Sequence, residues 1–163
     1  MKRLLIVWHS RTGAARAMAL AAADGAREAA AVEVQILAAE AAQAQDLLKA
    51  DGYLFAAPEN LAALSGEMKA FFDRNYYAAL DQLNGRPYAA LVAAGSDGEG
   101  AARQIARIAL GWRLKPVADP LIVITRAQTP EAIQAAKSIS DADLARCREL
   151  GSALAAGLEL GIF

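Results

Sequence analysis

The chain is poor in the side chains that most metal and nucleophilic sites use. Its 163 residues include one cysteine, Cys147, and one histidine, His9. A single cysteine excludes an intramolecular disulfide, and a single histidine leaves no second imidazole for a metal pair. Cys147 falls on the apolar stripe of a C-terminal helical pattern, which favours a buried thiol over a reactive one. We interpret His9 as packing beside the first expected strand, with contact to a ligand as the alternative.

An excess of one charge and a long apolar run are also missing. Lys and Arg number 17 against 18 Asp and Glu, so neither a nucleic-acid partner nor an anionic membrane is indicated. No apolar stretch approaches the roughly 20 residues of a membrane span. The basic and apolar start is too short for a signal peptide, and a cytoplasmic location is our expectation. Length and a hydrophobic share of 56% predict one domain, residues 1–163.

Short apolar runs alternate with helical patterns along the chain. The expected strands are 3–7, 32–37, 53–57, 88–94 and 121–124, and the expected helices are 14–30, 43–50, 66–80, 101–111 and two capped segments that begin at Thr129 and Ser140. This alternation predicts an α/β fold with a parallel sheet and helices on both faces. The economical arrangement has five strands in the order 2-1-3-4-5, so that the loops after the first, third and fourth strands meet in one crevice.

The loop after the first strand, HSRTGAAR at residues 9–16, runs directly into a helix. The unpaired amides and the positive dipole end of a helix N-terminus suit a phosphate. Ser10 and Thr12 add hydroxyl groups, the glycine lets the backbone come close, and either Arg11 or Arg16 adds charge. The simpler alternative is that one hydroxyl only caps the helix. Neither Gly-x-Gly-x-x-Gly nor the Walker pattern is present.

Two further loops leave the same predicted edge of the sheet. Pro58 has no amide hydrogen and is predicted to end the pairing of the third strand, while Ser65 is predicted to cap the following helix. The loop after the fourth strand reads GSDGEG at residues 95–100. Its glycines would let backbone lie against a flat ligand, although Gly-Ser-Asp-Gly is also ordinary turn chemistry. Their convergence with the first loop favours a mononucleotide site.

These loops resemble those of the flavodoxin-like FMN proteins, particularly the flavodoxin and NAD(P)H-dependent FMN reductase-type group. Ser10-x-Thr12-Gly13 resembles the phosphate loop, residues 58–74 resemble the second loop and its helix, and residues 95–98 resemble the third loop. The resemblance implies a three-layer flavodoxin-like sandwich with FMN as cofactor. It also implies a phosphate site of Ser10, Arg11, Thr12, Gly13, Ala14 and Ala15, a redox-edge loop of Pro58, Glu59, Asn60 and Leu61, and a pyrimidine-side loop of Gly95, Ser96, Asp97 and Gly98.

Two departures from the family pattern bear on activity. Gly13-Ala14-Ala15 stands where family loops commonly continue Gly-Asn-Thr, which removes neutral hydrogen bonds of about 0.5–1.5 kcal/mol each. The ring-facing loops also lack the Trp or Tyr that often sandwiches the flavin of electron carriers. The resemblance therefore implies an NAD(P)H-dependent reductase that passes electrons through FMN to a small acceptor such as a quinone. A module that binds without turnover and a one-electron carrier are the alternatives.

Three smaller expectations concern Glu59, the aromatic side chains and the oligomeric state. Glu59 either tunes a flavin at its reactive edge or is simply exposed to solvent. The aromatic side chains of the 71–77 segment and Trp112 are expected to pack in the core. A homodimer is the expectation if the flavin needs an aromatic side chain from outside its own loops.

Overall fold

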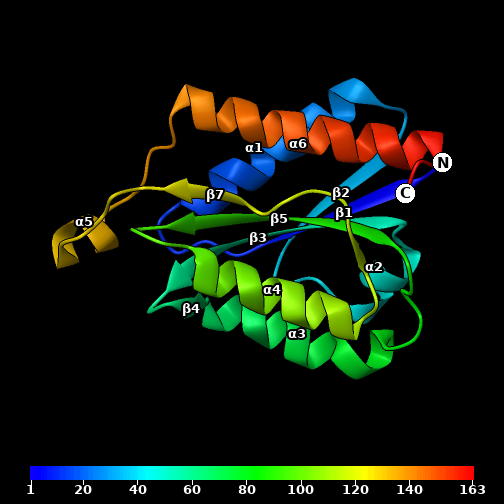
Figure 1. The fold of residues 1–163 in the computed structure, drawn as a ribbon, viewed down its shortest axis with the longest axis horizontal. Helices are drawn as coiled ribbons and strands as arrows, with labels where there is room; N and C mark the ends of the chain where they lie inside the picture. The colour runs from blue at the N-terminus through cyan, green and yellow to red at the C-terminus, as the bar shows by residue number, and fades with distance from the viewer.

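The computed structural model describes residues 1–163 as a parallel sheet between two helical layers (Figure 1). The strands are β1 (Arg3–Trp8), β2 (Glu33–Ala38), β3 (Gly52–Asn60), β4 (Ala63–Leu64), β5 (Pro87–Ala94), β6 (Lys115–Pro116) and β7 (Leu121–Ile124). The helices are α1 (Ala14–Ala29), α2 (Ala44–Lys49), α3 (Gly66–Ala79), α4 (Glu99–Gly111), α5 (Pro130–Gln134) and α6 (Asp141–Leu160). The predicted α/β sandwich is confirmed. None of these helices combines the length and the apolarity that crossing a membrane needs.

The sheet follows the predicted strand order. β1 pairs in parallel with β2 and β3, and β3 pairs in parallel with β5. The fifth position is shared by two short strands, because β6 pairs with the start of β5 and β7 with its end. Pro120, directly before β7, has no amide hydrogen to donate to the ladder. The order 2-1-3-4-5 is therefore confirmed, with the fifth strand interrupted.

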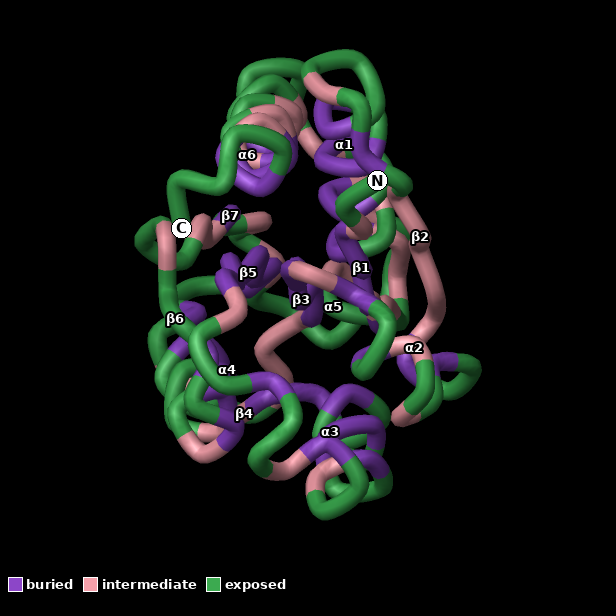
Figure 2. The backbone as a smooth tube through the Cα atoms, turned by 90° about the vertical axis from the view of Figure 1, so that its right-hand side faces the viewer, coloured by how far each residue is buried: buried purple, intermediate pink, exposed green.

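The two faces of the sheet are covered by different helices. α1 and α6 pack on one face, and α2, α3 and α4 pack on the other, with their buried residues turned toward the strands (Figures 1 and 2). The central strands are buried on both faces, which explains why they read as continuous apolar runs. Phe72 lies 5.1 Å from Phe55 and 5.6 Å from Trp112 between ring centroids. Tyr77, in contrast, is 83% exposed, so its expected place in the core is wrong.

Helices α1 and α6 approach each other closely through small residues. A Cβ atom at Gly151 would fall on the carbonyl oxygen of Ala22, and one at Gly25 would fall on that of Arg148. Cys147 lies fully buried in the same layer. Burial raises the pKa of its thiol to about 11, so little thiolate forms near neutral pH. The prediction of a buried, unreactive thiol is confirmed.

We expect Gly151→Ala to lower the free energy of unfolding by about 1–3 kcal/mol, because the added methyl group overpacks the α1–α6 contact. Urea unfolding followed by circular dichroism measures the change. Gly66→Ala is the matched control, since a Cβ there meets no atom within 4 Å, and it should stay within about 0.5 kcal/mol of the original protein. Equal stability of the two variants would show that α1 and α6 accommodate the added methyl group without loss of stability.

Candidate functional site

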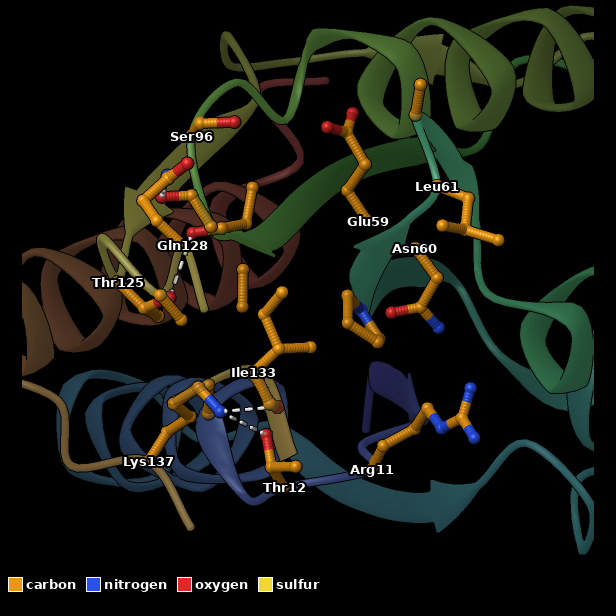
Figure 3. Close-up of a pocket in the computed structure, with 17 residues that line it drawn as sticks. Arg11, Thr12, Glu59, Asn60, Leu61, Ser96, Thr125, Gln128, Ile133 and Lys137 are labelled. Atoms are coloured by element: carbon orange, nitrogen blue, oxygen red, sulfur yellow. Dashed lines mark hydrogen bonds between the residues drawn. The ribbon is translucent and has the colours of Figure 1, made fainter. Parts of the chain in front are cut away.

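A cavity of about 530 Å³ opens at the carboxyl ends of β1, β3, β5 and β7 (Figure 3). This volume lies within the roughly 300–1,000 Å³ of small-molecule sites. The three loops expected from the sequence form part of its wall, and a fourth segment after β7 completes it. The crevice therefore lies where an open parallel sheet of this strand order binds ligands.

Nine of the residues expected at the site line the cavity: Arg11, Thr12, Ala14, Pro58, Glu59, Asn60, Leu61, Gly95 and Ser96. The other five, Ser10, Gly13, Ala15, Asp97 and Gly98, do not line it. Ser10 and Gly98 are instead engaged in the turns behind the wall, through hydrogen bonds to Gly13 and Glu59. The contact of all fourteen residues with a flavin stays a prediction.

The first loop presents the start of helix α1 to the cavity. Ser10 Oγ accepts a hydrogen bond of 3.0 Å from the amide of Gly13, whose φ of 100° suits glycine. Ala14 and Ala15 then begin the helix, and amides of a first helical turn have no partner within the helix. The helix thus offers neutral donors and a positive dipole end, which fits a phosphate group. Arg16 does not add its charge there, because its guanidinium lies 5.7 Å from the centre of the Trp8 ring.

The second loop is a β-hairpin, not an irregular loop. The parallel pairing of β3 with β5 ends at Pro58, as predicted, with Ala93 as its partner. β3 itself continues to Asn60 and pairs there with β4 in antiparallel register, which was not predicted. Proline lacks only the donor, and its carbonyl oxygen still accepts a hydrogen bond from the amide of Ser65 at 3.2 Å. Leu61 and Ala62 form the turn with φ of 51° and 63°, which is the left-handed pattern of a type I′ hairpin turn. The Leu61 side chain is fully exposed at the cavity rim.

Glu59 ties this hairpin to helix α4. Its carboxylate accepts hydrogen bonds from the amides of Gly98 at 2.9 Å and Ala101 at 3.0 Å, at the positive end of the helix dipole. The amide of Leu64 donates to Gln104 Oε1 at 2.6 Å, which adds a second tie. Glu59 is therefore a structural anchor at the cavity wall, a role that neither alternative from the sequence included.

Ser65 and His9 connect the first loop to helix α3. Ser65 stands at the N-cap position but makes no capping hydrogen bond, so the predicted capping role is wrong. Its hydroxyl lies 2.9 Å from Nδ1 of His9 instead, and Nε2 of His9 lies 3.5 Å from the carboxylate of Glu67. His9 is only 8% exposed and does not line the cavity, which supports the interpretation as a packed histidine.

The fourth wall segment, residues 125–137, was missed by the sequence reasoning. The amide of Thr125 donates to the carbonyl oxygen of Ala94 at 2.7 Å, and the amide of Lys137 donates to that of Thr12 at 2.8 Å. The missed lining residues are Ala62, Ala93, Ala94, Thr125, Ala127, Gln128, Ile133 and Lys137. The sequence did contain a pattern that could have indicated this wall segment. The capped helix start at Thr129 comes shortly after β7, whose carboxyl end faces the crevice.

The fold and the cavity define a flavodoxin-like protein. A flavodoxin from the domain Archaea superposes with a TM-score of 0.77 at 22% identity, covering 96% of this chain and 98% of that one. Oxidised flavodoxin 1 from Bacillus cereus superposes with a TM-score of 0.79 at 19% identity over 96% and 99% of the two chains. Residues 9–129 match the model of the NADPH-dependent FMN reductases, and the chain belongs to that family.

A relative by sequence is the flavodoxin of Aquifex aeolicus (strain VF5), 32% identical over 100 residues. This match covers 61% of the chain and 54% of the relative, so it spans about half of that protein's length. The predicted relationship to flavodoxin-like FMN proteins is confirmed by the family match. FMN, the cofactor expected from the sequence, is the flavin that the family's description names.

We expect Ala62→Gly to raise the free energy of unfolding by about 0.5–1 kcal/mol. A left-handed residue with a Cβ costs about 1–2 kcal/mol, and glycine avoids this cost at the expense of a more flexible unfolded chain. Ala63→Gly is the control, because Ala63 lies in the β4 strand and should lose about 0.5–1 kcal/mol. Urea unfolding of both variants gives the comparison, and destabilisation by Ala62→Gly would show that the turn carries no strain.

Proposed function

We propose that the protein is an FMN-dependent NAD(P)H oxidoreductase that passes electrons to a small acceptor such as a quinone. The observation that carries this proposal is the composition of the cavity wall. None of its 17 lining residues is Phe, Tyr or Trp, so no aromatic side chain of the wall competes for the face of a flat ligand. A nicotinamide or a quinone needs that face free, because hydride transfer requires the two reacting rings in contact.

The residues of the wall fit the two ends of a flavin nucleotide. The α1 N-terminus and the hydroxyl of Thr12 provide donors for the phosphate. Pro58, Asn60 and Leu61 line the part of the wall that the sequence assigned to the redox edge. FMN itself supplies the hydride and electron chemistry when bound, and the protein binds it, orients it and limits access of water.

A module that binds a ligand without turnover is the second candidate. Ala14 and Ala15 favour it, because they offer no side-chain hydrogen bonds at the start of α1. Such a protein would bind FMN weakly or not at all. A one-electron carrier would bind FMN tightly but would not accept hydride from a nicotinamide.

Titration of FMN with the purified protein tests the proposal. We expect quenching of the flavin fluorescence to saturate at one equivalent with a micromolar or tighter dissociation constant. Anaerobic addition of NADPH or NADH should then bleach the visible flavin band, and a small quinone should restore it. No saturable binding at micromolar FMN would contradict the proposal and favour a module that binds another ligand. Reduction by dithionite but by neither nicotinamide would identify a carrier instead.

A further inference from the structure

A phosphate at the start of α1 would meet mostly neutral groups in the first loop. A phosphate monoester carries about −1.5 to −2 charges at neutral pH. Thr12 contributes one hydroxyl, Ala14 and Ala15 contribute amides only, and Arg16 is directed onto the Trp8 ring. Arg11 lines the cavity, but Figure 3 shows its guanidinium on the side of Asn60, away from the residues that follow β7.

Lys137 supplies a positive charge on the other side of this loop. Its Nζ lies 3.2 Å from Thr12 Oγ1 and 2.8 Å from the carbonyl oxygen of Ile133 (Figure 3). It also lies 2.6 Å from the carbonyl oxygen of Ala135. The Lys137 amide also donates to the carbonyl oxygen of Thr12 at 2.8 Å. Backbone and side chain therefore both fix this lysine against the first loop, although 125 residues separate it from Thr12.

The charge of Lys137 has no counter-charge in the protein. All nine salt bridges involve other residues, and the lysines at positions 2 and 69 do pair with Asp51 and Asp73. The three oxygens around the Lys137 ammonium are neutral, and the residue is half-buried in the cavity wall. An unpaired cation beside a helix N-terminus creates a positive potential that a bound anion would neutralise.

We propose that Lys137 binds the phosphate of the flavin and makes the site select flavin mononucleotide over unphosphorylated riboflavin. This inference rests on the proposed function, because it takes a flavin as the ligand. It assigns the phosphate contacts lacking at Ala14 and Ala15 to a residue that lies beyond the family match, which ends at residue 129. All three N–H donors of the Lys137 ammonium face neutral oxygens, so a phosphate oxygen takes the place of one of them. The bond gained is charge-assisted, which is the stronger kind.

The test compares the dissociation constants of FMN and riboflavin for four proteins. Lys137→Met removes the charge and keeps a chain of similar length, and Lys137→Arg restores the charge. Lys115→Met is the matched control, because Lys115 is exposed on β6 at the opposite end of β5 and forms no ion pair. Fluorescence quenching of both flavins by the original protein and by each variant gives the eight constants.

We expect Lys137→Met to weaken FMN binding about 10- to 150-fold, the equivalent of a hydrogen bond to a charged group, and to leave riboflavin binding unchanged. Lys137→Arg should recover most of the FMN affinity, and Lys115→Met should alter neither ligand. Equal weakening of FMN and riboflavin binding by Lys137→Met would show that the residue only shapes the fourth wall segment, and would overturn the inference.

Two further outcomes separate this inference from the proposed function. Unchanged FMN affinity in Lys137→Met, or equal affinities of the original protein for FMN and riboflavin, would overturn the role of Lys137 while flavin binding stands. Failure of the original protein to bind either flavin would overturn the proposed function, and the inference with it.

Discussion

The two hydrogen bonds that the Glu59 carboxylate accepts from the amides of Gly98 and Ala101 hold the β3–β4 hairpin against the start of α4. They fix the spacing between the second and third loops and thus the width of the cavity. The same contact requires Gly100, because a Cβ there would meet the carbonyl oxygen of Ala62. Left-handed backbone costs about 1–2 kcal/mol per residue, and the turn keeps this conformation because both ends of the hairpin are tied down.

The sheet and the place of the crevice could be predicted from the sequence because both depend on local patterns. Buried parallel strands read as apolar runs, and a doubly wound sheet brings the carboxyl ends of the first, third and fourth strands together. The hairpin could not be predicted in this way. Its anchors at Gly98 and Ala101 lie 39 and 42 residues from Glu59. Ser65 likewise meets His9 across 56 residues, and this tertiary contact replaces the local cap that its position suggested.

The segment after β7 shows the same division between local and distant information. Its helix start could be predicted, since Thr129 accepts a hydrogen bond from the amide of Ala132 within one turn. Its place across the mouth of the first loop depends on Lys137 and Thr12, which are far apart in the chain. The sequence alone therefore points to Arg11 or Arg16 as the positive charge of the first loop, and Arg16 packs on Trp8 instead.

The cavity is chemically different at its two ends, and this asymmetry constrains how a bound ligand can be oriented. Thr12, Lys137 and the start of α1 present donors and positive charge at one end. At the other end Pro58, Leu61 and Ala62 present apolar surface near the rim, and Arg11 adds a charge on the side of Asn60 (Figure 3). Under the proposed function, a flavin nucleotide places its phosphate at the start of α1 and its flat end at the hairpin. The wall has no aromatic side chain to cover that flat end. The proposed hydride transfer relies on this, because it needs a second planar molecule stacked on the ring.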